Sequence, residues 1–239
     1  IMFYNIGALC KNDLFIKVGK ELCIGESFDK FDFQKQNIGI NPNDAWKRKN
    51  LKEPWYPGDN VNLSIGQGFV KTNALQLAVM MARIASLGKK VEPTLKPVIT
   101  APEFEEININ SAFLKFVKDG LYEGTNSPGG TSYGSRIKEK GFEFCGKTGT
   151  AQVVSKFLQK HEYTDITRPH GLFAGFAPFE NSRFSASVII ENGGFGSSAA
   201  APVGKNVLYF SQLLHAGRLE DAKKLCENLG LDVNSIFQK

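Results

Sequence analysis

The sequence contains no run of about eighteen apolar residues, the length that a helix needs to cross a bilayer. It also lacks the basic, apolar and small-residue regions that make up a signal peptide. These absences argue against a membrane span or a secretion signal within the chain. The first residue is Ile1 and not methionine, so we expect a piece of a longer protein whose targeting segment lies elsewhere.

Metal-binding patterns are missing as well. The four cysteines, Cys10, Cys23, Cys145 and Cys226, form no C-x-x-C motif and no Cys/His cluster, which argues against a zinc site. Three of them have apolar neighbours in the sequence, so we expect these three to be small buried hydrophobic residues. The sequence leaves open a disulfide between any pair.

The chain has little excess charge. Its 29 Lys and Arg residues against 24 Asp and Glu residues leave a net charge of +5 and a pI of about 8.9. The positive charges are scattered along the chain, which argues against nucleic acid as a partner. Hydrophobic residues make up 42% of the 239, so we expect an ordinary globular protein able to bury the core of one large domain.

Apolar residues recur at helical spacing in several segments. The clearest segment begins with Asn73 and Gln76 as an N-x-x-Q capping box, and Gly88 stops it. Asn12 or Asp13 can cap a second helix, which runs to about Leu22. The predicted helices are Ile1–Cys10, Asn12–Leu22, Asn73–Ser86, Ser111–Glu123, Pro202–Leu214 and Leu219–Leu229.

Several other segments predict irregular or extended structure. The polar stretch Ser27–Asn50 is expected to be an extended excursion, with its basic run Lys47–Lys49 facing water. Two prolines make Val91–Ile99 an edge strand or an extended connector. Glycines predict a loop over Asn126–Gly134, and polar residues predict a long loop over Ser155–Arg168.

Gly66 and Gly68 form a G-x-G before the Asn73 helix, a pattern that also opens dinucleotide-binding sites. The third glycine of that fingerprint would fall at Lys71, and no strand with an acidic end follows about twenty residues later. The dinucleotide class is therefore excluded. We expect a tight turn with close backbone packing at these glycines.

Three segments after residue 140 predict β-strands: Phe142–Val153, His170–Ala177 and Phe184–Glu191. The third alternates cleanly in polarity, and a short turn connects it to the second, so we predict that the three form an antiparallel meander. The helix Pro202–Leu214 is expected to pack across one face of this sheet. Helices followed by strands and a further helix indicate an α+β fold, an antiparallel sheet with packed helices.

The first of these strands contains the candidate site, Lys147, Thr148, Gly149 and Thr150. A period of two places Lys147 and Gly149 on one face and the two threonines on the other. At a sheet edge, the ammonium, the hydroxyls and the backbone N–H groups form a small anion site. An extended ligand with a carboxylate could bind there as an added strand. The alternative is a surface strand end with a solvated lysine.

Several segments together resemble a known family, the class B penicillin-binding proteins, and most closely their elongation-type members. The resemblance covers Ile1 to Leu214 and implies a partial transpeptidase domain of the serine β-lactamase-like fold, with residues 215–239 as a tail that contains a short helix. The segments that carry it, in order, are PWYPGD, SIGQGF, LQLA, KDGLYEGTNSPGGT, GKTGTAQVV, HGLFAGFAPF and VIIENGG.

The resemblance implies peptidoglycan D,D-transpeptidation, in which a serine attacks the D-Ala–D-Ala bond of a stem peptide. β-Lactams mimic that dipeptide and acylate the same serine. The hydroxyls of Thr148 and Thr150 would hold the substrate carboxylate beside Lys147 and Gly149, and the Thr150 N–H would join the oxyanion hole. The family needs no metal or cofactor. It works at the periplasmic face of the bacterial inner membrane, anchored outside this chain, with membrane-bound wall-synthesis proteins as partners.

Two motifs of the family are not in place. S-x-N, which serves proton transfer, does not occur in the sequence. S-x-x-K, which supplies nucleophile and base, matches at Ser86/Lys89 and Ser135/Lys138, but Ser86 closes a helix and Ser135 stands just before the K-T-G strand. We therefore expect no nucleophile or base in this chain, with both upstream of Ile1, and a fragment that is itself inactive.

Two other functions stay open at this point. One is a penicillin-recognising serine hydrolase, which needs a deacylating base that no glutamate in a matching motif supplies here. The other is a non-catalytic scaffold of the wall-synthesis complex, which would have the fold without S-x-x-K. The residues encoded upstream of Ile1 would separate these alternatives.

Overall fold

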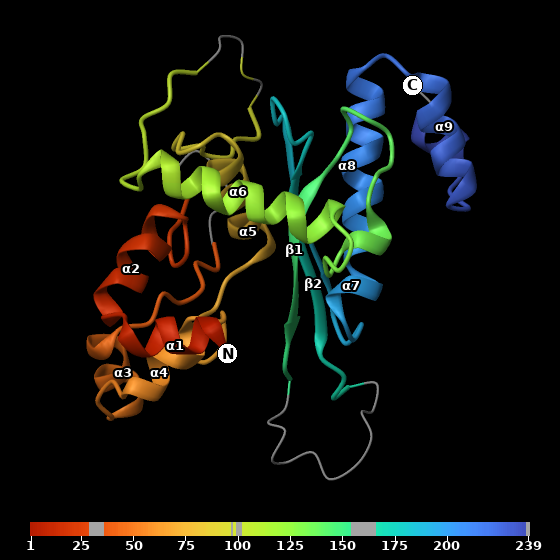
Figure 1. Cartoon of the computed structure of the whole chain (residues 1–239). Helices are drawn as coiled ribbons and strands as arrows, with labels where there is room; N and C mark the ends of the chain where they lie inside the picture. Colours follow the sequence, from red (N-terminus) through yellow and green to blue (C-terminus); the bar gives the residue numbers. More distant parts are fainter. Residues whose placement is uncertain (29–35, 97, 99–101, 154–165, 238–239) are drawn as a thin grey trace. The chain divides into compact units, whose positions relative to one another are not determined.

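The computed structural model describes residues 1–28, 36–96, 98, 102–153 and 166–237 (Figure 1). The chain forms two units, Ile1–Phe116 and Val117–Lys239. The predicted boundary at residue 214 stays a prediction. Helices and a three-stranded antiparallel sheet together confirm the α+β class.

The first unit is built from helices, including the predicted one after Asn73. Asn73 Oδ1 accepts the Gln76 N–H at 2.8 Å, and Gln76 Oε1 accepts the Asn73 N–H at 3.2 Å, so the capping box is confirmed. Lys11 occupies the cap of α2, so the predicted cap at Asn12 or Asp13 was wrong; the Asn12 amide instead donates to Pro42 O at 3.5 Å. The helices are α1 (Met2–Leu9), α2 (Asn12–Glu21), α3 (Asp44–Leu51), α4 (Pro57–Leu63) and α5 (Ala74–Ala85).

The helix α3 corrects the predicted extended excursion over Ser27–Asn50. Asn43 caps it by accepting the Trp46 N–H at 2.8 Å, and Asp44 pairs with Arg48 at 2.8 Å one turn later. These local polar contacts start the helix where the apolar spacing of the sequence is weak. Residues 29–35 of the excursion lie outside the described residues.

Lys47 is buried, contrary to the prediction that the basic run faces water. It is 2% exposed, and its Nζ lies 2.7 Å from Asp59 Oδ2 and 3.6 Å from Glu53 Oε2. Burial opposes its charge, but the hydrogen bond and charge of Asp59, with the charges of Glu53 and Tyr56, outweigh burial and raise the Lys47 pKa. The ion pair ties α3 to the start of α4.

We expect Lys47→Met to lower the melting temperature by on the order of 10 °C, because Asp59, with a side chain only 14% exposed, would lose its partner. Arg48→Met is the matched control, since Arg48 follows Lys47 on α3 and its side chain is 61% exposed. The control should shift the melting temperature by no more than about 2 °C. Thermal melting followed by circular dichroism compares them, and equal melting temperatures would contradict a stabilising buried pair.

The predicted segment Val91–Ile99 is a connector. Its described residues, 91–96 and 98, form no strand. Lys89 and Glu106 on either side form an isolated antiparallel bridge. Of the two alternatives, the extended connector is therefore confirmed for the described residues.

The sheet of the second unit has the predicted meander order, β1-β2-β3, with antiparallel pairing throughout. β1 is shorter than the predicted Phe142–Val153. Phe142 precedes the strand because its N–H bonds to Glu139 O in a turn, and its ring packs edge-on against Tyr209. Residues 154–165 of the predicted polar loop lie outside the described residues. The strands are β1 (Cys145–Ala151), β2 (His170–Ala177) and β3 (Phe184–Ile190).

Two helices, α7 (Gly196–Ala199) and α8 (Ala201–His215), cover one face of this sheet (Figure 1). Phe173, fully buried at the middle of β2, meets the ring of Phe144 edge-on with 5.6 Å between ring centroids. A Cβ added at Gly204 of α8 would collide with the Phe173 ring, so the helix backbone packs directly on that ring. The predicted packing of this helix on the sheet is confirmed.

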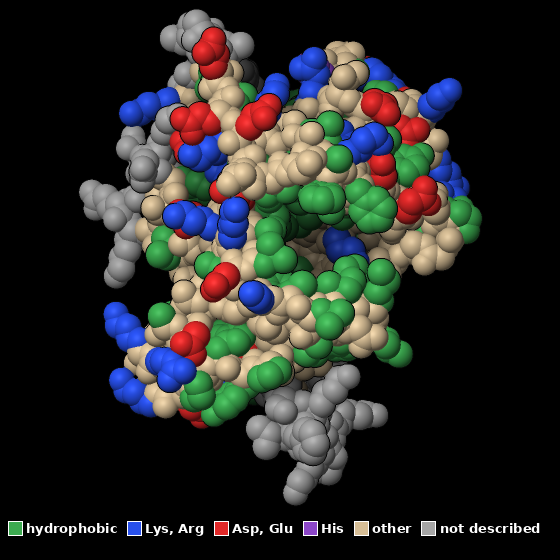
Figure 2. All heavy atoms as spheres, turned by 60° about the vertical axis from the view of Figure 1, so that its left-hand side comes forward, with side chains coloured by type: hydrophobic (Ala, Val, Ile, Leu, Met, Phe, Trp, Pro, Cys, Tyr) green, Lys and Arg blue, Asp and Glu red, His purple; other side chains and the backbone are tan. Residues whose placement is uncertain are grey.

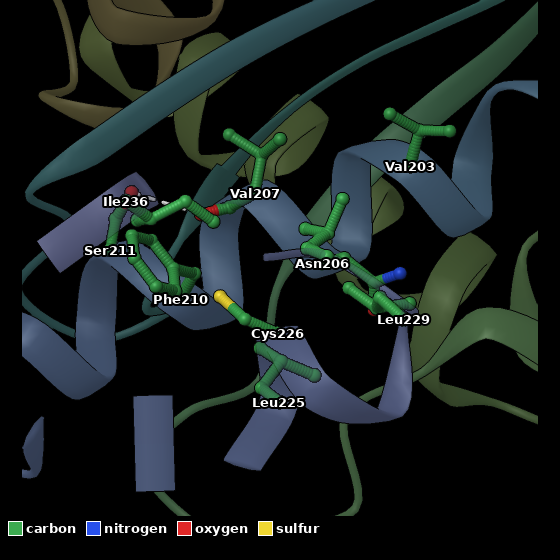
Figure 3. A pocket seen from close by; sticks show the side chains of 10 residues that line it. Val203, Asn206, Val207, Phe210, Ser211, Leu225, Cys226, Leu229 and Ile236 are labelled. Carbon is green, nitrogen blue, oxygen red and sulfur yellow. Dashed lines mark hydrogen bonds between the residues drawn. The ribbon is translucent and has the colours of Figure 1, made fainter. Parts of the chain in front are cut away.

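The tail forms α9 (Leu219–Asn228), as predicted, and α10 (Val233–Phe237). A pocket of about 410 Å³ lies between these helices and α8, and Figure 3 shows Cys226 and Phe210 among its apolar lining. Arg218 at the start of the tail pairs with Glu139, which also accepts the Tyr209 hydroxyl at 2.5 Å. The bonds from Tyr209 and Arg218 lower the pKa of Glu139.

All four cysteines are free thiols. Cys23, Cys145 and Cys226 are buried, which confirms the expectation for three of the four. Burial raises the pKa of Cys23 to about 11 and raises that of Cys145 as well. Both thiols are therefore protonated and poorly nucleophilic at neutral pH.

The surface carries mixed charge. Figure 2 shows basic and acidic side chains interspersed over the visible face. This agrees with the scattered positive charges of the sequence. In the part of the chain that the structure describes, no helix has the length and apolar character needed to cross a membrane.

Candidate functional site

The K-T-G-T sequence lies within β1, which is an edge strand of the sheet that the described residues form, because the strand order begins with it. The register places Lys147 opposite Ala174, and Thr148 opposite Phe173. Side chains of directly paired residues share a face of a sheet. Lys147 therefore belongs to the face opposite the one that α8 covers, and Thr148 belongs to the covered face.

Lys147 supplies the charge of the candidate site. Its side chain is exposed, and Nζ donates to the carbonyl oxygen of Thr148 at 3.0 Å. The ammonium is thus held over the strand edge, beside the backbone of the next residue. A single anionic group that approaches the edge at Thr148 would meet this charge first.

Two threonines supply hydroxyls one strand period apart. Thr148 and Thr150 are both half-buried. The Thr148 hydroxyl lies 3.5 Å from the hydroxyl of Thr131, which comes from the glycine-rich loop between α6 (Ser111–Asn126) and the 3₁₀ helix η1 (Tyr133–Ser135). The predicted loop over Asn126–Gly134 therefore reaches the candidate site through Thr131.

Close backbone packing shapes the strand around these residues. A Cβ added at Gly146 would lie 2.5 Å from the Phe173 ring and 2.6 Å from the carbonyl oxygen of Ala174. A Cβ added at Gly196 would collide with the carbonyl oxygens of Gly149 and Leu172, so the start of α7 rests on the strand backbone at Gly149. Side chains at either glycine would push the strand out of place.

The serines that match S-x-x-K lie elsewhere. Ser86 is the C-cap of α5, and its hydroxyl donates to the Ala82 carbonyl at 2.8 Å. Ser135 ends η1. A third match, Ser27 to Lys30, reaches beyond the described residues; Ser27 itself is exposed on the irregular segment that follows α2.

Sequence patterns did not point to two residues of the candidate site, Thr125 and Thr131. Thr125 ends α6 and bonds to the backbone of Gly146, and Thr131 reaches Thr148. Neither follows from a local pattern, because each partner lies 17 or more residues away along the chain. Within the described residues, no group of three or more His, Cys, Asp or Glu side chains could hold a metal ion.

Comparisons with protein-family models and with curated proteins both match this chain to peptidoglycan transpeptidases. The family model described as penicillin binding protein transpeptidase domain matches residues 1–209. Peptidoglycan D,D-transpeptidase MrdA of Haemophilus influenzae is 31% identical over 199 residues, covering 77% of this chain and 30% of that protein. MrdA of Acinetobacter baumannii is 35% identical over 188 residues, covering 71% and 27%. The chain thus spans less than a third of these relatives.

Solved structures of similar fold come from the same group. PBP2 of Pseudomonas aeruginosa in complex with WCK 5153 has a TM-score of 0.75 and 29% identity, and the match covers 89% of this chain and 46% of that one. The complex of PBP2 and MreC from Helicobacter pylori has a TM-score of 0.76 and 27% identity, with coverages of 91% and 38%. These matches confirm the predicted transpeptidase-type fold.

Proposed function

Because the chain belongs to the penicillin-binding protein transpeptidase family, we propose that it is the C-terminal portion of a peptidoglycan D,D-transpeptidase whose β1 edge binds the substrate carboxylate. The nucleophilic serine and the base lysine come, in this proposal, from preceding residues of a longer protein. The observation that carries the proposal is the place of Lys147–Thr150. An exposed ammonium and two hydroxyls lie on an edge strand, within the part of the chain that matches the family.

The proposed reaction is an acyl transfer in two steps. In the first, the serine oxygen bonds to the carbonyl carbon of the penultimate D-alanine, and the C–N bond to the terminal D-alanine breaks. The serine proton passes through the base to the leaving amine. In the second, the amine of another stem peptide attacks the ester, forms the cross-link and returns a proton to the serine oxygen.

The residues of this chain bind and orient the substrate in both steps. The Lys147 ammonium attracts the carboxylate of the terminal D-alanine, and the Thr148 and Thr150 hydroxyls donate to it. Gly149 has no side chain, so the ligand can approach the strand backbone closely between the two threonines. The Thr150 N–H donates to the oxyanion that forms at the attacked carbonyl, where a fixed donor stabilises the transition state. β-Lactams carry a carboxylate in the same relation to their reactive carbonyl and would bind alike.

The proposal extends to location and partners. The longer protein would work at the periplasmic face of the inner membrane, with its anchor outside this chain, and would assemble with membrane-bound wall-synthesis proteins. The partner proposal is supported by the structure of PBP2 in complex with MreC from Helicobacter pylori, because the match to that structure covers 91% of this chain. The substrates would be peptidoglycan stem peptides.

Labelling with a fluorescent penicillin tests the proposed function. The chain alone should form no covalent adduct, whereas a longer protein that includes S-x-x-K and S-x-N should form one adduct per molecule. A stoichiometric adduct on Ser27, Ser86 or Ser135, located by mass spectrometry of peptides, would refute the upstream nucleophile. A folded longer protein that stays unlabelled would favour the scaffold, and an adduct that is rapidly hydrolysed would favour the hydrolase.

A further inference from the structure

The end of α6 contacts the outer edge of β1 just before the K-T-G-T residues. Thr125, fully buried in the last turn of α6, accepts the Gly146 N–H at 3.2 Å. Its hydroxyl proton is shared between the carbonyl oxygens of Gly146 at 3.3 Å and Leu121 at 3.2 Å. Beside it, Asn126 Nδ2 donates to the Phe144 carbonyl at 3.0 Å. Two side chains of one helix thus occupy three backbone groups along this edge.

Among the described residues, the hydrogen bonds from α6 to this edge run from Phe144 to Gly146. Backbone groups of an antiparallel strand face the partner strand at every second residue and face outward at the others. Since the Gly146 groups bond to Thr125, the next outward-facing groups belong to Thr148 and Thr150. The Thr148 carbonyl lies beside the Lys147 ammonium, at 3.0 Å. The candidate anion site therefore begins where the cover from α6 ends.

A glycine-containing edge strand specifies the register of an added strand weakly. A ligand that slides by two residues keeps its side chains on the same faces, so nothing in the alternation opposes the slip. Gly146 and Gly149 offer no side chains to block it. Such a slip moves the ligand by about 7 Å, which would separate its carboxylate from Lys147. A fixed stop at Gly146 would prevent this movement.

We propose that Thr125 is a positioning residue that closes the β1 edge at Gly146 and so sets the register of an extended ligand, which pairs from Thr148 onward. Both Gly146 groups are already bonded, and a fully buried hydroxyl between a helix and a strand has little room to move. The inference rests on the proposed function, because its ligand is a D-Ala–D-Ala peptide whose carboxylate binds at Lys147. Thr125 acts through Gly146 and does not touch that peptide.

Amide hydrogen exchange on the chain, followed by NMR, tests the closure of the edge. Thr125→Val keeps the branched shape and removes the hydroxyl, so the Gly146 N–H should exchange roughly tenfold faster or more. Thr125→Ser restores the hydroxyl and should stay within about twofold of the wild type. Thr131→Val is the control, since it removes a hydroxyl beside Thr148 and should leave Gly146 protected.

Thr125→Ala gives a second deletion variant that adds no bulk, in case Thr125→Val does not fold. Circular dichroism and the dispersion of the NMR spectrum show which variants are folded. Unchanged protection of the Gly146 N–H in a folded Val or Ala variant would overturn the closure of the edge by Thr125.

Titration with acetyl-D-alanyl-D-alanine tests the register. In the wild type, the amide signals of Thr148 and Thr150 should shift while that of Gly146 stays. In Thr125→Val, binding should weaken by roughly fivefold and the shifts should spread to Gly146, with recovery in Thr125→Ser. A mere loss of stability would not extend the binding edge in this way.

Two outcomes separate the inference from the proposed function. If the dipeptide binds Thr125→Val with the wild-type affinity and the wild-type pattern of shifts, the positioning role is wrong although the site is right. If the dipeptide shifts no β1 amide even in the wild type, the proposed function of the edge fails, and the register role fails with it. Exchange at Gly146 would then still decide whether Thr125 closes the edge.

Discussion

Lys147→Ala is expected to slow acylation by a β-lactam by on the order of a hundredfold, measured in a longer protein that also contains S-x-x-K and S-x-N. The side chain is exposed, and its ammonium lies over the strand edge, 3.0 Å from the Thr148 carbonyl. In the proposed function, its loss removes the positive charge that would attract the carboxylate in both the ground state and the transition state. The second-order rate constant of acylation measures the effect.

Thermal melting of the same variants tests whether the loss of acylation rate arises without a loss of stability. An exposed lysine contributes little to stability, so Lys147→Ala should melt within about 2 °C of the wild type. Lys140→Ala is the matched control, because Lys140 is also exposed and lies seven positions before Lys147 in the sequence, outside the strand. Thr148→Val should slow acylation less than Lys147→Ala, since it removes one neutral hydroxyl. Unchanged acylation by a folded Lys147→Ala variant would exclude this strand as the carboxylate site.

Phe173→Ala is expected to lower the free energy of unfolding by about 3–5 kcal/mol, the range for a large buried aromatic residue. Phe173 is fully buried and contacts Phe144 edge-on, and α8 packs on its ring at Gly204. Its removal leaves a cavity between the sheet and α8 that rigid neighbours cannot fill. Because Phe173 is paired with Thr148, the loss of packing lies directly behind the candidate site.

Urea denaturation followed by far-UV circular dichroism measures this change. Phe195→Ala is the control, since Phe195 lies in the same unit and is 69% exposed; it should change the free energy of unfolding by less than about 1 kcal/mol. Phe173→Leu should fall between the two because it keeps part of the buried volume. Similar losses for Phe173→Ala and Phe195→Ala would show that the α8–sheet core is not what stabilises this unit.

Local patterns were enough to predict most of the elements. The helix after Asn73 has its capping box and its glycine stop within the same 16 residues. The strand from Phe184 alternates in polarity, and a short turn connects it to the strand that ends at Ala177. Such patterns involve residues that are close in sequence, so they can be recognised without knowing the tertiary structure. The K-T-G-T residues could likewise be assigned to a strand, and the structure places them in β1, at one end of the order of the described sheet.

Contacts between distant segments decided the rest. Polarity predicted a solvated Lys47, but its side chain is buried and pairs with the partly buried Asp59 and the exposed Glu53. The aromatic residue Phe142 predicted an early start for β1, but its ring packs on Tyr209, 67 residues later, and its N–H closes a turn. In both cases a contact with a residue more than ten positions away decides the environment of the side chain, against what its residue type alone suggests.

Sequence by itself determined the chemistry of the candidate site, because Lys147 and the two threonines are set by residue type and by the period of a strand. Only the tertiary structure decided that the backbone groups of Gly146, just before these residues, bond to a side chain of α6. Thr125 and Gly146 are 21 residues apart and belong to different elements, so their bonds exist only once α6 has packed beside β1. A buried backbone group needs a partner, but no local pattern specifies which helix will provide it.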